Sequence, residues 1–121
     1  MISRKPTCVI VIPTYNEAES IGDMITHLFT KIFPQVDDYD MHLLVVDDTS
    51  PDGTYKIVKN FQKKHKKLHL LINPKKAGIG YAYIQGFKYA MSKLNADVVF
   101  EFDGDFQHPP ALIPIMLNRI E

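Results

Sequence analysis

Four short apolar runs, each followed by a segment with helical spacing, constrain the fold of this 121-residue chain more than any other feature. The runs cover residues 8–13, 41–46, 68–73 and 97–102. They are continuous rather than alternating in polarity, which is typical of strands buried on both faces. Four alternations of strand and helix therefore predict one α/β domain over residues 1–121, a three-layer α/β/α structure with a mainly parallel sheet.

The helices are predicted from their start signals and their apolar spacing. Asn16 and Glu19 have the spacing of a capping box, so the first helix should begin there and end at Pro34. The third helix should run over residues 80–95. Its apolar stripe, which we expect to face the sheet, consists of Ile79, Tyr83, Phe87, Ala90, Met91 and Leu94.

Composition excludes several classes of protein. Lys plus Arg and Asp plus Glu both number 14, so no global charge recruits nucleic acid as a partner. The apolar runs fall far short of the roughly 20 residues that cross a bilayer. Cys8 has no intrachain partner and begins an apolar run, which favours a small buried residue in a reducing compartment. We therefore expect a cytoplasmic chain that does not bind nucleic acid.

Polar, turn-rich loops follow all four predicted strands. They read PTYNE (13–17), DDTSPDG (47–53), NPKKAG (73–78) and DGDFQH (103–108). Ligands of parallel α/β sheets bind outside the carboxyl ends of the strands, where these loops meet. The sequence therefore predicts one ligand site at one edge of the sheet.

The loop after the last strand has the ligands of a hard divalent cation. Asp103 and Asp105 are two residues apart in extended chain, so their carboxylates leave on the same side. Gln107 can add a carbonyl oxygen, and Gly104 permits close approach of a bulky anion. Such oxygen donors favour Mg²⁺ or Mn²⁺, which commonly holds a diphosphate. The alternative is an Asp-Gly turn with solvated aspartates.

The other loops suit a nucleotide. Asp48 stands beside a second acid in a loop that cannot easily satisfy both internally, so one carboxylate is available to a base N–H. Pro13 and Tyr15 can form a wall against the base, and Glu17 can reach a base or a ribose hydroxyl. Alternatively, Tyr15 packs within the protein and Glu17 stabilises a helix N-terminus.

Four motifs together resemble one enzyme family. VIPTYNEAESI, LLVVDDTSPDGT, KKAGIGYAYIQGFKYA and FDGDFQHPP, in this order and spacing, are similar to the inverting family 2 glycosyltransferases of GT-A fold, most of all to the polyprenol-phosphate mannose synthases. The resemblance implies nucleotide-sugar contacts at Pro13, Tyr15, Glu17, Val46 and Asp48, and at the DXD-type triplet Asp103, Gly104 and Asp105. It implies metal ligands at Asp103, Asp105 and Gln107, with Asp105 as the catalytic residue; Gly104 departs from the alanine usual in the family.

The implied reaction is transfer of a hexose, most of all mannose from GDP-mannose, to a polyprenyl or dolichyl phosphate, with Mg²⁺ or Mn²⁺ as cofactor. Alternatives are a UDP-sugar-dependent family 2 transferase with another acceptor, a nucleotidyltransferase, or a noncatalytic nucleotide-binding module. Family members continue with an acceptor-side portion, so we interpret the chain as a truncated, N-terminal donor- and metal-binding part. We expect that part to lack turnover and to self-associate through uncovered surface, and the full-length protein to lie at the cytoplasmic face of a membrane.

Overall fold

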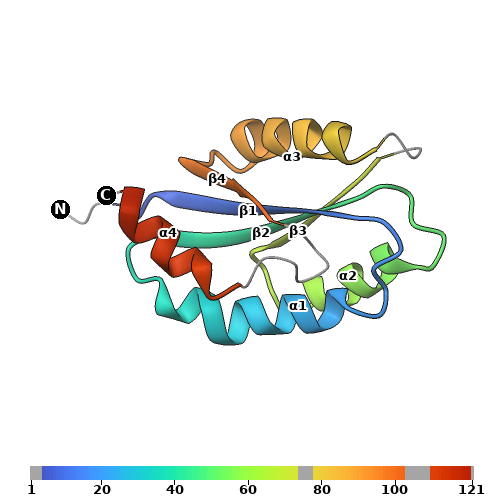
Figure 1. Cartoon of the computed structure of the whole chain (residues 1–121), viewed down its shortest axis with the longest axis horizontal. Coiled ribbons are helices and arrows are strands. Elements are labelled where there is room, and N and C mark those ends of the chain that lie inside the picture. The colour runs from blue at the N-terminus through green and yellow to red at the C-terminus, as the bar shows by residue number, and fades with distance from the viewer. Residues whose placement is uncertain (1–3, 74–77, 103–109, 121) are drawn as a thin grey trace.

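A four-stranded parallel sheet forms the centre of the protein (Figure 1). The computed structural model describes residues 4–73, 78–102 and 110–120. The strands are β1 (Thr7–Thr14), β2 (Asp40–Asp47), β3 (Leu68–Ile72) and β4 (Val98–Glu101), in the order β3-β2-β1-β4. The predicted parallel α/β sheet is therefore confirmed, and each strand lies within two residues of its predicted bounds.

Helices cover both faces of the sheet (Figure 1). The helix α1 (Ile21–His27) continues through a π-helical segment, Leu28–Ile32, and a 3-10 turn, Phe33–Gln35. With α2 (Thr54–Gln62) and α4 (Leu112–Ile120) it covers one face, and α3 (Ile79–Lys93) covers the other. Among the residues that the structure describes, no helix has the length and apolar character of a membrane span.

Three details of the helix predictions are wrong. No capping box forms at Asn16, because Asn16 has a left-handed backbone with φ of 56° and α1 begins only after Ser20, without a side-chain cap. Pro34 lies inside the 3-10 turn, so the helical path ends at Gln35, one residue later than predicted. Met91 is 60% exposed, so the sheet-facing stripe of α3 does not include it.

β1 lies between two separate hydrophobic cores, which explains its continuous apolar sequence. Cys8, Ile10 and Ile12 pack toward α1, α2 and α4, whereas Val9 and Val11 pack toward α3. All five side chains are fully buried. Cys8 is fully buried in the core, which confirms the interpretation of this cysteine as a small core residue, and burial raises the pKa of its thiol to about 12.

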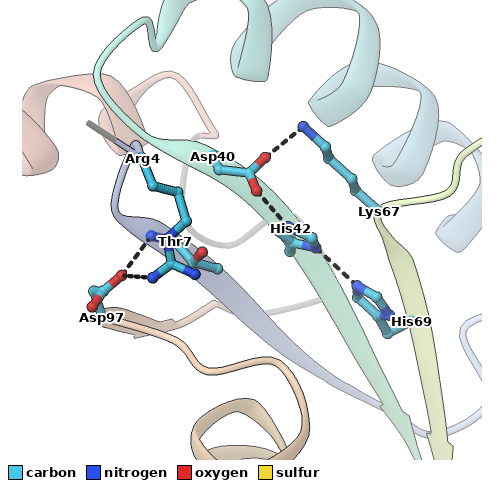
Figure 2. Close-up of polar contacts among 7 residues, drawn as sticks. All are labelled: Arg4, Thr7, Asp40, His42, Lys67, His69 and Asp97. Carbon is cyan, nitrogen blue, oxygen red and sulfur yellow. Dashed lines mark hydrogen bonds and ion pairs between the residues drawn. The ribbon is translucent and has the colours of Figure 1, made fainter. Parts of the chain in front are cut away.

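A polar chain joins β2 to β3 and to Lys67, the residue before β3 (Figure 2). His42 Nδ1 lies 2.9 Å from His69 Nε2, and His42 Nε2 lies 3.1 Å from the Asp40 carboxylate. Lys67 Nζ contacts the other Asp40 oxygen at 2.5 Å. Burial alone would raise the pKa of Asp40, but the bonds from Lys67 and His42 lower it overall. These contacts order four polar side chains.

We expect the stability of the protein to decrease as the pH falls below about 6.5, in part because of His69. Burial, and then the neighbouring His42, lower the pKa of His69 from 6.5. The unfolded chain therefore takes up this proton at a higher pH than the folded chain does, so the contribution of neutral His69 is complete above pH 6.5 and is lost below it. Urea unfolding at pH 7.5 and 5.5 should show that the free energy of unfolding depends less on pH in His69→Gln than in the unaltered protein. His27→Gln, at an exposed position, is the control, and an unchanged dependence in His69→Gln would contradict the assignment.

Candidate functional site

The candidate site lies at the carboxyl ends of β1, β2 and β4. The strand order places β2 and β3 on one side of β1 and β4 on the other, so the chain reverses direction across the sheet between β1 and β4. Such a reversal is the point where ligands of doubly wound sheets bind. The loops of residues 15–20 and 48–53 lie next to each other there, because Asp48 N donates to Thr14 O at 2.9 Å.

Four of the predicted nucleotide-contact residues belong to the ends of β1 and β2 or to the loop after β1. Pro13 and Val46 are partners in the β1–β2 register, and both are buried. Tyr15, the first residue after β1, is 38% exposed. Glu17 is half-buried and accepts a hydrogen bond from Ser20 Oγ at 3.3 Å. The structure therefore brings these residues together, while their contact with a nucleotide stays a prediction.

Asp47 is a structural centre of the site that sequence reasoning missed. Its side chain is fully buried, and its carboxylate accepts from Thr14 Oγ1 at 2.8 Å, from Ser50 Oγ at 2.5 Å and from Ser50 N at 3.0 Å. The Asp-x-x-Ser spacing of a side-chain-stabilised turn was the available signal for the two bonds with Ser50. The bond with Thr14 depends on the pairing of β1 with β2, which no local pattern contains.

Asp48 connects the loop after β2 to the chain after β3. Its carboxylate accepts from Asn73 Nδ2 at 3.3 Å and from Gly78 N at 3.1 Å, and its side chain is 5% exposed. The expectation that the loop leaves one of its two acids without internal partners is therefore wrong. The predicted contact of Asp48 with a base is not decided by these bonds.

Backbone strain marks the same loop. Thr49 has φ of 56°, a left-handed conformation that costs about 1–2 kcal/mol for a residue with a Cβ atom. It follows Asp48 directly, and its Oγ1 donates to Asn73 O. The hydrogen bonds of Asp47, Asp48 and Thr49 to neighbouring segments hold this backbone conformation of the loop after β2.

The predicted metal ligands lie outside the described residues. These are Asp103, Asp105 and Gln107, together with Gly104. β4 ends at Glu101, which pairs with Val11 of β1, so the chain enters this segment at the reversal point between β1 and β4. Two carboxylates and an amide oxygen fit a hard divalent cation. Within residues 4–73, 78–102 and 110–120, no group of three His, Cys, Asp or Glu side chains could hold a metal.

The architecture is that of the GT-A glycosyltransferases. A mannosyltransferase from Pyrobaculum calidifontis, solved in complex with GDP-Man and Mn²⁺, superposes with a TM-score of 0.71 at 24% identity, covering 91% of this chain and 30% of that one. Mannosyl-3-phosphoglycerate synthase from Rubrobacter xylanophilus gives the same TM-score at 22% identity, covering 95% and 36%. At these identities the likeness concerns the fold alone.

The chain belongs to glycosyl transferase family 2, whose sequence model matches residues 9–121. It is 34% identical over 112 residues to a dolichol-phosphate mannosyltransferase of Pyrococcus furiosus, covering 93% of this chain and 29% of that protein. It is 36% identical over 110 residues to an undecaprenyl-phosphate mannosyltransferase of Micrococcus luteus, covering 91% and 42%. The chain thus spans less than half the length of these two relatives.

Proposed function

We propose that the protein binds a nucleotide-sugar donor, with GDP-mannose as the favoured one, for transfer of the sugar to a polyprenyl phosphate. The observation that carries the proposal is the meeting of the loops after β1 and β2 beside the reversal point of the sheet, in a chain whose relatives include polyprenyl-phosphate mannosyltransferases. A related fold was solved with GDP-Man and Mn²⁺. The acceptor is a membrane lipid, so we further propose that the whole protein works at a cytoplasmic membrane face.

Each group of residues has a role in this proposal. The nucleoside lies against Pro13, Tyr15 and Val46, with Glu17 and Asp48 as acceptors for N–H or hydroxyl groups. Asp103, Asp105 and Gln107 would hold Mg²⁺ or Mn²⁺. When bound, the metal supplies a Lewis acid that neutralises the departing diphosphate.

The proposed reaction is an inverting displacement. A phosphate oxygen of the lipid attacks the anomeric carbon of the sugar from the side opposite the nucleotide. The bond from that carbon to the diphosphate oxygen breaks, and its electron pair leaves with the nucleoside diphosphate. The acceptor phosphate is already anionic near neutral pH, so the reaction does not require a strong general base.

Calorimetry with three ligands tests the proposal. We expect GDP-mannose to bind, and to bind more tightly with Mn²⁺ present, because the metal pairs with the diphosphate. UDP-glucose and a nucleoside triphosphate, each with and without Mn²⁺, are the comparison ligands. Tighter binding of UDP-glucose would support the UDP-sugar alternative, and binding of the triphosphate alone would contradict a glycosyltransferase.

A further inference from the structure

Three consecutive backbone N–H groups of the loop after β1 are occupied by side chains of the β2–α2 segment. Asn16 N donates to Ser50 Oγ at 2.9 Å. Glu17 N donates to Thr54 Oγ1, and Ala18 N to Asp52 Oδ2, each at 3.1 Å. The acceptors are more than 30 residues away in the sequence, so these bonds join two separate loops of the site.

Two carboxylates hold the acceptors in place. Asp47 receives both the hydroxyl and the backbone N–H of Ser50, and Asp52 Oδ1 receives both the hydroxyl and the backbone N–H of Thr54. Because each hydroxyl donates its proton to a carboxylate, its oxygen faces the loop after β1 as an acceptor. Burial alone would raise the pKa of Asp52, but the bonds from Thr54 and Ala18 lower it overall, which keeps this carboxylate charged.

The occupied N–H groups limit what the loop after β1 can bind. In many nucleotide-binding α/β proteins, free N–H groups of the first strand-to-helix loop hold the phosphates. Here those of Asn16, Glu17 and Ala18 are used, and farther along, past Glu19, Ser20 N and Ile21 N donate to Glu17 O. The loop therefore presents side chains to a ligand, and Tyr15 is exposed among them.

We propose that the pairs Asp47–Ser50 and Asp52–Thr54 are positioning residues, which withhold the N–H groups of Asn16, Glu17 and Ala18 from phosphate and hold the loop after β1 for recognition of the nucleoside. This inference rests on the proposed function, because it assumes a nucleotide-sugar donor. The base and ribose of the donor then depend on the loops after β1 and β2, and the diphosphate depends on groups outside the loop after β1.

Ser50→Ala and Thr54→Val test the proposal. Each removes one hydroxyl acceptor and leaves a loop N–H without its partner, which should weaken nucleoside binding by roughly two- to tenfold, the usual worth of one hydrogen bond. Calorimetry is done well below the unfolding temperature, with GDP and with pyrophosphate, each with and without Mn²⁺. The expected result is a similar loss of GDP affinity with and without Mn²⁺, and an unchanged pyrophosphate affinity with Mn²⁺.

Ser92→Ala is the matched control, because its hydroxyl donates to Lys88 O on α3, on the other face of the sheet. Folded variants that bind GDP like the unaltered protein would overturn the proposal, and so would an equal loss for pyrophosphate. If a variant does not fold, hydrogen exchange of the unaltered protein tests the proposal instead. Fast exchange of the backbone N–H groups of Asn16, Glu17 and Ala18 would contradict their hydrogen bonds and overturn the proposal. Failure of the proposed function differs, since the unaltered protein would then bind neither GDP nor pyrophosphate.

Discussion

Replacing Gly86 with alanine is expected to destabilise the protein by about 1–3 kcal/mol, although alanine favours helices. α3 packs so closely on the sheet that a Cβ atom at this position would lie 2.5 Å from Val11 Cγ1 and 3.1 Å from Val46 Cγ2. Both valines belong to buried strands, so neither can move without disturbing its neighbours. Urea unfolding at neutral pH measures the loss.

Gly80→Ala is the matched control in the same helix. A Cβ atom there would meet no atom within 4 Å, so this substitution should be neutral or stabilise by up to about 1 kcal/mol. Combining Gly86→Ala with Val11→Ala should cost less than the sum of the two single changes, because the smaller side chain relieves the overlap. Additive losses, or a neutral Gly86→Ala, would contradict the close approach of α3 to β1.

Asp105→Asn should remove most of the Mn²⁺-dependent gain in GDP affinity, a loss of about 100-fold or more in metal affinity. Replacing residues that only support metal ligands costs about 10- to 100-fold, and a direct ligand should cost at least as much. The amide retains the shape of the side chain but loses its charge, so the fold should be intact. Calorimetric titration of GDP with and without Mn²⁺ measures the change.

Asp23→Asn is the control for this experiment, because Asp23 is exposed on α1 and undergoes the same chemical change. Circular dichroism of both variants should match the unaltered protein. An Asp105→Asn variant that kept its full Mn²⁺ dependence would refute the assignment of Asp105 as a metal ligand, while leaving the family and the fold untouched.

The strands were predictable because their chemistry is local. Both faces of β1 are covered, and its run of buried apolar residues contains that information directly. The helix start was not predictable in the same way: Asn16 has good capping chemistry, but its N–H is used by Ser50 from another loop. Likewise, the exposure of Met91 follows from how α3 lies on the sheet, which its apolar character does not reveal.

For the candidate site too, some features follow from the sequence and others only from the tertiary structure. The sequence by itself determined the alternation of strands and helices and the family motifs, and it predicts the oxygen ligands after the last strand. Only the tertiary structure decided the strand order, which places the reversal point between β1 and β4, and the distinct roles of the neighbours Asp47 and Asp48. The physical reason is that the partners of both carboxylates include groups distant in sequence, so strand pairing and loop packing, rather than residue type, determine what each can bind.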